Sequence, residues 1–267
     1  MRLRDLTARF DAFLVDVWGV VHDGDRPFSH VIPALEALAA EGRRVVFLTN
    51  TSRLGPAVAE SLEKMGIARS LFEDVITAGD VTRDALVSRD AALFEGLSAA
   101  PRTYHFGAAA YVPWLFELDL VFTEDIRESE LIVATGAVAD DDALVDAREH
   151  LAPAAARDVP LVCTNPDRVI PTAAGPKLGP GAIAEAYAGL GGRTFLYGKP
   201  HAAIYTEARR RLGALDAARI LALGDMIDTD VCGARDAGLP SALVIGTGLA
   251  QTAHDVVPDF VLDGFAW

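Results

Sequence analysis

The chain has 267 residues, of which 51% are apolar and 23% are charged, and its formal net charge at pH 7 is −14. The length suits one large or two modest domains, and the composition is that of a globular protein with a buried core. A negative field of this size repels nucleic-acid backbones and anionic lipid surfaces, so we expect neither as a partner. A phosphate site in this chain would have to be built locally, from a metal ion, a lysine and backbone amides.

The first third of the chain alternates between strand and helix patterns. Strands are expected at 12–17, 44–48 and 75–77, and helices at 31–40, 55–65 and from a cap at Asp80 to about residue 88. This alternating order predicts a parallel, doubly wound α/β sheet.

The α/β pattern restarts near residue 92 and then returns to the first pattern after Gly191-Gly192. The middle block has expected strands at 103–106, 118–122, 131–135 and 160–163, a helix at 140–151, and a turn-rich segment leading into a helix that ends near 188. The last block has strands at 195–197, 219–223, 241–245 and 260–262, with helices at 202–212 and 229–237. We therefore predict a core of residues 1–81 plus 195–267, interrupted by an inserted domain of residues 82–194.

Four polar residues stand at or just after the ends of apolar strands: Asp16, Thr49, Lys199 and Asp225. Each alone would be interpreted as a turn former, helix cap or surface group. Ligands of open α/β sheets, however, bind outside the carboxyl ends of the strands, and the fold would gather these four residues there. The joint pattern predicts one phosphate site.

Each residue type fits phosphoryl transfer to a carboxylate. Asp16 is the expected nucleophile, and together with Asp225 it would hold Mg²⁺ through hard oxygen ligands. Asp230 would orient that metal shell or bind a metal water. Thr49 would donate to phosphoryl oxygens. Lys199 would neutralise the nucleophile and the developing charge, and it is one of only three lysines in a chain with 21 arginines.

Four segments resemble the four motifs of the haloacid dehalogenase superfamily. They are Asp16-Val17-Trp18-Gly19-Val20, Leu48-Thr49-Asn50-Thr51-Ser52, Gly198-Lys199-Pro200 and Leu223-Gly224-Asp225-Met226-Ile227-Asp228-Thr229-Asp230. Their spacing, and the long insert between the second and third, are similar to the class IIA branch, which includes sugar phosphatases and pyridoxal phosphate phosphatases. The resemblance covers nearly the whole chain and does not specify the substrate.

The resemblance implies a Rossmann-like core with a mobile α/β cap that carries substrate specificity. It implies Mg²⁺ bound by Asp16, Asp225 and the backbone carbonyl of Trp18, and a role for Asn50 in binding the phosphoryl group. The implied activity is Mg²⁺-dependent hydrolysis of a small phosphorylated metabolite through an aspartyl-phosphate. A homodimer through the caps is consistent with the same resemblance.

Trp18 departs from the family pattern, in which a second Asp two residues after the nucleophile protonates the leaving group. An indole cannot donate a proton near neutral pH, and losing a general acid costs roughly 10²- to 10⁴-fold in rate. The backbone-carbonyl contact with the metal tolerates any side chain. Trp18 itself would either pack beside the nucleophile loop or form a wall of the substrate pocket.

Four interpretations of this departure are open. The substrate has a good leaving group, as in an acyl phosphate, a phosphoanhydride or an aryl phosphate. Alternatively another residue is the acid, with His22, Asp23 or a cap residue as candidates. The chain could instead be an inactive phosphometabolite-binding sensor or partner protein. A phosphonate-cleaving enzyme with a Schiff base on Lys177 is the weakest of the four.

The turn-rich segment of the inserted domain carries the candidates for substrate contact. These are Asn165 and Asp167, with Arg168 and Thr172 nearby, although a purely structural loop would have the same composition. The two cysteines, Cys163 and Cys232, have neither metal-ligand spacing nor a disulfide framework, which favours a reducing cytoplasm. The apolar start of the chain carries Asp11 and Asp16 and lacks a cleavage site, so we expect no signal peptide, and no apolar run is as long as a membrane span.

Overall fold

The computed structural model describes residues 1–107, 109–170, 172, 175–245 and 255–267. It divides into two compact units. The first unit consists of Met1–Thr49, Gly55–Thr77 and Lys199–Trp267, and the second consists of Asn50–Leu54 and Ala78–Gly198. Within the described residues, no helix is long and apolar enough to cross a membrane.

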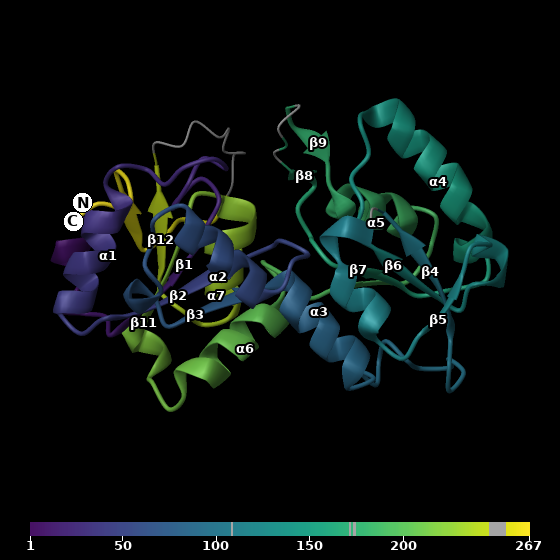
Figure 1. Ribbon diagram of the computed structural model, residues 1–267, viewed down its shortest axis with the longest axis horizontal. Helices are drawn as coiled ribbons and strands as arrows, with labels where there is room; N and C mark the ends of the chain where they lie inside the picture. The colour runs from purple at the N-terminus through teal and green to yellow at the C-terminus, as the bar shows by residue number, and fades with distance from the viewer. Residues whose placement is uncertain (108, 171, 173–174, 246–254) are drawn as a thin grey trace. The chain divides into compact units, whose positions relative to one another are not determined.

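The first unit contains a six-stranded parallel sheet in the order β13-β12-β11-β1-β2-β3 (Figure 1). The strands are β1 (Ala12–Val15), β2 (Arg44–Thr49), β3 (Asp74–Thr77), β11 (Ile220–Gly224), β12 (Ser241–Val244) and β13 (Phe260–Leu262). Counted along the unit, this is the Rossmann order 3-2-1-4-5-6, which reverses between β1 and β11. Ligands are expected outside the carboxyl ends of these two strands.

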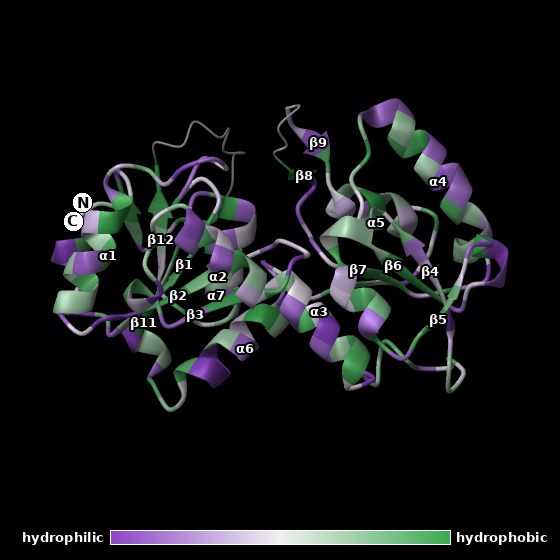
Figure 2. Cartoon of the chain, in the orientation of Figure 1, coloured by the Kyte–Doolittle hydropathy of each residue, from purple (hydrophilic) through white to green (hydrophobic). Residues whose placement is uncertain are grey.

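The helices of the first unit cover an apolar sheet. They are α1 (Val31–Ala40), α2 (Gly55–Lys64), α6 (Ala202–Leu212) and α7 (Cys232–Asp236), with a π-helical turn at Ile227–Val231 and 3-10 turns at Leu3–Asp5, Arg69–Leu71 and Ala217–Arg219. All four residues of β1 are buried, as in a parallel sheet packed on both faces. Figure 2 shows the same contrast, with hydrophobic strands and helices of mixed hydropathy.

The second unit contains a five-stranded parallel sheet in the order β10-β7-β6-β4-β5. Its strands are β4 (Arg102–Phe106), β5 (Val121–Thr123), β6 (Leu131–Ala134), β7 (Leu161–Cys163) and β10 (Thr194–Leu196), and β8 (Val169–Ile170) with β9 (Lys177–Leu178) forms a separate hairpin. Its helices are α3 (Ala78–Val87), α4 (Asp141–Ala155) and α5 (Pro180–Ala188), with 3-10 turns at Ala109–Tyr111, Pro113–Glu117 and Ile126–Glu128. Ile132 and Ala134 belong to one apolar cluster while Leu131 and Val133 belong to another, so this sheet is also packed on both faces.

The predicted α/β fold is confirmed, and several element boundaries differ from the expected ones. Helix α3 begins at Ala78, so Asp80 lies in its first turn and is not its N-cap. Strand β5 spans Val121–Thr123, so it begins and ends later than the expected strand at 118–122. Helix α4 was expected at 140–151, but Asp140 is its N-cap and the helix continues past Pro153 to Ala155. Residues 169–170 and 177–178 form the hairpin, which was expected to be turns.

The two units divide at positions close to, but different from, the expected domain boundaries. The second unit extends from Ala78 to Gly198 and also takes in residues 50–54. This short segment is held by side chains of the second unit. Ser52 Oγ lies 2.6 Å from Thr164 Oγ1, and Trp114 Nε1 donates to the Ser52 carbonyl at 3.0 Å.

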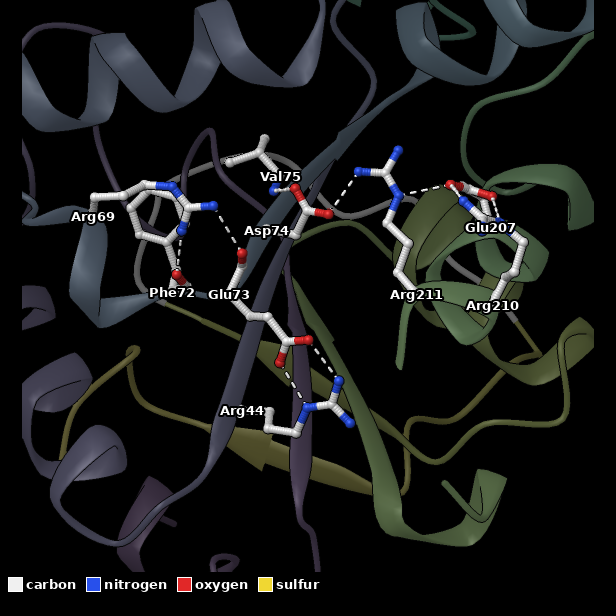
Figure 3. Close-up of polar contacts among 9 residues, drawn as sticks. All are labelled: Arg44, Arg69, Phe72, Glu73, Asp74, Val75, Glu207, Arg210 and Arg211. Atoms are coloured by element: carbon white, nitrogen blue, oxygen red, sulfur yellow. Dashed lines mark hydrogen bonds and ion pairs between the residues drawn. The ribbon is translucent and has the colours of Figure 1, made fainter. Parts of the chain in front are cut away.

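Ion pairs tie together the amino-terminal ends of β2 and β3 in the first unit (Figure 3). Arg44 donates two hydrogen bonds of 2.6 Å to the carboxylate of Glu73. Arg211, in the last turn of α6, donates to Asp74 at 2.7 Å and to Glu207 at 2.6 Å. These contacts lie at the opposite end of the strands from the candidate site.

Candidate metal and phosphate site

The sheet of the first unit brings Asp16 and Asp225 to its topological switch point. Asp16 directly follows β1, and Asp225 directly follows β11. The strands β1 and β11 are hydrogen-bonded neighbours in the sheet. The backbone N–H of Asp16 continues this ladder by donating to the carbonyl of Leu223 at 2.8 Å. Two strands that are far apart in the sequence therefore place two carboxylates at the same edge of the sheet.

Lys199 is buried against two carboxylates. Its Nζ donates to Asp16 Oδ1 at 2.6 Å and to Asp230 Oδ1 at 2.7 Å. The exposed fractions of these side chains are 4% for Lys199, 10% for Asp16 and 6% for Asp230. Charge-assisted hydrogen bonds of this length in a dry site are strong and directional.

The turn after β11 fixes Asp230. Its Oδ2 accepts from the backbone N–H of Met226 at 3.1 Å, while Oδ1 accepts from Lys199. A Cβ on Gly224 would collide with the Asp230 side chain, so the end of β11 requires glycine. The buried Tyr205 hydroxyl donates to the carbonyl of Thr229 at 3.2 Å and anchors this turn from α6.

Burial and mutual repulsion govern the ionisation of this cluster. Burial raises the pKa of Asp16 well above its usual value; the ammonium of Lys199 opposes this effect, while Asp230 and Asp225 add to it. Burial alone would lower the pKa of Lys199, but Asp16 and Asp230 outweigh it and the pKa is raised. Lys199 is therefore a permanent cation.

The donor set fits a hard divalent cation. Asp16, Asp225 and Asp230 each offer a carboxylate oxygen, and these atoms lie within 4.8 Å of one another. The cluster holds three carboxylates and one ammonium. Carboxylate oxygens are the ligands that Mg²⁺ prefers. Gly19, at φ +83°, leaves the space that Asp225 occupies, because a Cβ there would collide with Oδ2.

The loop after Asp16 holds Trp18, His22 and Asp23. The Trp18 side chain is partly exposed and lies beside Gly24. His22 Nδ1 accepts from the backbone N–H of Gly24 at 2.9 Å. Asp23 Oδ1 accepts from the N–H groups of Asp25 and Arg26 at 3.0 and 2.9 Å. This loop is thus closed by its own polar side chains.

The remaining predicted residues are divided between the units. Thr49 is buried at the end of β2 in the first unit, whereas Asn50 is the first residue of the second unit. There Asn50 Nδ2 donates to Asp167 Oδ1 at 2.8 Å, and Asn165 Oδ1 accepts from the Asp167 N–H at 2.9 Å. Asn165 and Asp167, expected to contact substrate, thus have hydrogen-bond partners within their own unit, and their proposed contact with substrate stays a prediction.

Comparison with known proteins shows the family of the chain. Models of the haloacid dehalogenase-like hydrolase and HAD-hydrolase-like families match residues 13–112 and 196–267. A solved structure of a haloacid dehalogenase-like hydrolase from Brucella suis 1330 is 32% identical, with a TM-score of 0.85 and 99% of each chain covered. The chain belongs to the haloacid dehalogenase-like hydrolases.

Relatives within this family are named phosphatases. Glycerol-3-phosphate phosphatase from Gallus gallus is 28% identical over 98% of this chain and 92% of its own. Chronophin from Homo sapiens is 27% identical over 99% of this chain and 94% of its own. The chain is accordingly a phosphoric monoester hydrolase of the haloacid dehalogenase type, a group whose phosphatases generally use Mg²⁺.

For two supporting residues, no role was predicted from the sequence. Tyr205 and Gly224 hold the Asp230 turn, but neither carries a chemical signal of its own in the sequence. The glycine immediately before Asp225 was the only hint in the sequence, since a close approach of another side chain to the backbone requires this residue type.

Proposed function

We propose that this enzyme is a Mg²⁺-dependent phosphatase that hydrolyses a small phosphorylated metabolite through an aspartyl-phosphate on Asp16. The observation that carries the proposal is the buried contact of Lys199 with both Asp16 and Asp230, next to Asp225. A structural salt bridge would need one carboxylate for one ammonium. The surplus of carboxylates at a strand edge is instead the arrangement of a cation and phosphate site.

We propose the following roles for the side chains. An Asp16 carboxylate oxygen attacks phosphorus, and the bond from phosphorus to the leaving-group oxygen breaks. Water then attacks the phosphorus of the aspartyl-phosphate, which releases inorganic phosphate and restores the Asp16 carboxylate. Lys199 neutralises the charge that develops, and Thr49 and Asn50 donate to phosphoryl oxygens. Mg²⁺, held by Asp16, Asp225 and the carbonyl of Trp18 and oriented through Asp230, would neutralise the phosphoryl group.

The nucleophile loop offers no proton donor for the leaving group. Trp18 has no acidic proton near neutral pH. Burial lowers the pKa of His22, and its Nδ1 already accepts a hydrogen bond from Gly24, which the imidazolium form could not do. Backbone hydrogen bonds from Arg26 and Asp25 lower the pKa of Asp23, so its carboxyl group stays ionised.

The lack of a proton donor in the nucleophile loop indicates the class of substrate. A leaving group that departs as a stable anion needs no proton, so we propose acyl or aryl phosphates, or phosphoanhydrides, as the preferred substrates. The relative from Gallus gallus is a glycerol-3-phosphate phosphatase, so small phosphorylated metabolites are among the substrates to be tested. We further propose a reducing compartment, the cytoplasm, because Cys163 is a buried free thiol and Cys232 is also free. A homodimer through the second unit stays a prediction.

A phosphate-release screen tests the proposal. Purified protein with Mg²⁺ is assayed on a panel of acyl, aryl, alkyl and sugar phosphates, with Asp16→Asn as the matched inactive variant. We expect release from the acyl and aryl members and none with Asp16→Asn. Release that survives this substitution would overturn the nucleophile assignment. Mg²⁺-dependent ligand binding without any turnover would instead identify a phosphometabolite-binding protein.

A further inference from the structure

Tyr205 is a buried residue that joins α6 to the turn after β11. The residue is only 1% exposed. Its hydroxyl donates to the backbone carbonyl of Thr229 at 3.2 Å, and the carbonyl of Asp230 lies 3.4 Å away, where it shares the same hydrogen. Burial, and after it the charge of Asp230, raises the pKa of this hydroxyl, so it is a hydrogen-bond donor at neutral pH.

The turn that Tyr205 contacts has an unusual backbone. Residues Ile227–Val231 form a single π-helical turn, a rare structure that occurs frequently at functional sites. On its other side, Tyr205 packs against the start of α7, because a Cβ on Gly233 would collide with the hydroxyl and the ring. Tyr205 is thus enclosed between α7 and the π-helical turn, with its hydroxyl directed at the turn.

The segment that carries Tyr205 also carries the lysine of the site. Helix α6 begins at Ala202, three residues after Lys199. Lys199 Nζ donates to Asp230 Oδ1 at 2.7 Å. The short segment from Lys199 to Tyr205 therefore holds Asp230 twice, at its carboxylate through the lysine and at its backbone through the tyrosine.

The three carboxylates of the site repel one another. One oxygen each of Asp16, Asp225 and Asp230 lies within 4.8 Å of the others. Before a cation binds, this repulsion acts to move the Asp230 turn away from the strand ends, and the hydrogen bonds to the turn oppose that movement. A binding site that already has its final arrangement gives a higher affinity, because no binding free energy is used to rearrange it.

We propose that Tyr205 is a positioning residue for the metal site, which acts through the turn Ile227–Val231 and keeps Asp230 in place before the cation binds. The inference rests on the proposed function, because it assumes that Mg²⁺ binds beside Asp230. Tyr205 needs no contact with the cation or the substrate for this role, since its hydroxyl donates to the turn. Its hydroxyl should therefore govern the affinity for Mg²⁺.

Removal of the hydroxyl alone tests the proposal. Tyr205→Phe keeps the ring, and Mg²⁺ affinity is measured by isothermal titration calorimetry on the purified protein without substrate. We expect the affinity to fall about twofold to tenfold, as for loss of one hydrogen bond. Hydrogen–deuterium exchange of residues 226–231 should be faster than in wild type without Mg²⁺, and should slow again when Mg²⁺ is added.

Tyr187→Phe is the matched control. Tyr187 is also fully buried, in α5 of the second unit, and its hydroxyl donates to the backbone carbonyl of Val159 at 2.7 Å. Thermal unfolding should show a comparable loss of stability in the two variants, since both lose one buried hydrogen bond. We expect Mg²⁺ affinity and the exchange of residues 226–231 to be unchanged in Tyr187→Phe. Equal weakening of Mg²⁺ binding in both variants would overturn the inference.

Gly233→Ala tests the same contact from α7. The added methyl group would collide with the Tyr205 hydroxyl, so it should weaken Mg²⁺ binding as Tyr205→Phe does, and it decides the question if Tyr205→Phe does not fold. Unchanged Mg²⁺ affinity in the folded variants would overturn the inference while leaving the proposed function intact. Absence of Mg²⁺ binding in wild type would instead overturn the proposed metal site.

Discussion

Lys199 Nζ and Asp16 Oδ1 lie 2.6 Å apart although 183 residues separate them in the chain. Both groups are buried, and the ammonium also contacts Asp230. Such a contact forms only when the first and last blocks of the chain assemble into one sheet. The ion pair is therefore a product of the folded first unit, and the carboxylates around it are ligands that suit a divalent cation.

Mg²⁺ should stabilise the folded protein. Binding to the native state at about 100 times its dissociation constant adds roughly 2.7 kcal/mol to the free energy of unfolding. We expect the unfolding temperature to rise with Mg²⁺ and to fall again with a chelator. Asp225→Asn, which removes a buried carboxylate, should abolish most of this rise. Asp236→Asn, an exposed carboxylate paired with Arg235, is the control and should retain it. An equal rise in both variants would argue against the site.

Trp18→Asp should restore a general acid to the nucleophile loop. For alkyl phosphates, whose leaving groups are poor, we expect kcat/KM to rise by about 10²-fold or more. For aryl phosphates with acidic phenols the change should be small. The measurement is the slope of log kcat/KM against leaving-group pKa, which should be steep in wild type and shallow in the variant. A shallow slope in wild type would mean that another residue already supplies the proton.

Gly224→Ala should damage the site through packing alone. The new methyl group would collide with the Asp230 side chain, which Lys199 and Met226 hold in place. Overpacking of this kind costs about 1–3 kcal/mol, and we expect lower stability together with a large loss of activity. The control is Gly189→Ala, at a right-handed helical position where the nearest atom is 3.4 Å away. Normal activity in Gly224→Ala would show that Asp230 can move without consequence.

The ion pair between Arg44 and Glu73 should make a small, pH-dependent contribution to the free energy of unfolding. Arg44 lowers the pKa of Glu73 below its ordinary 4.5, so the contribution is present above that value and is lost as pH falls through the lowered pKa. Glu73→Gln should reduce the free energy of unfolding by about 0.5–1 kcal/mol at neutral pH, since the pair is partly solvent-exposed. In acid, below the lowered pKa of Glu73, the variant and wild type should converge.

Chemical denaturation at both pH values measures this difference. Glu60→Gln removes a more exposed partner, of Lys64, and serves as the control with a smaller expected effect. A loss for Glu73→Gln that persists unchanged in acid would point to packing, not to the ion pair.

The sequence predicted the sheet and the first-unit site for one physical reason. Parallel strands end at a common edge, so polar residues that follow apolar runs converge there, as Asp16 and Asp225 do. The second contact of Lys199, with Asp230, required the turn after β11 and could not be derived from spacing. The chain sequence also gave no sign that α4 would pass Pro153, where packing of the later residues against the second-unit core outweighs the missing hydrogen bond.

The fate of residues 50–54 could not be predicted either. Their partners, Thr164, Trp114 and Asp167, lie at least 62 residues away in sequence, and side-chain pairing over such a separation has no local signature. The predicted domain boundaries followed the periodicity of strands and helices, which ignores such contacts.

The chain crosses between its units at four places: after Thr49, Leu54, Thr77 and Gly198. The second unit therefore cannot be exchanged between relatives, by recombination or in an engineered chimaera, as one continuous segment. A graft of residues 78–198 alone would bring new neighbours to Ser52 and Asn50 without replacing them. Transplanted specificity in this family should consequently require the five-residue segment 50–54 to travel with the larger insert.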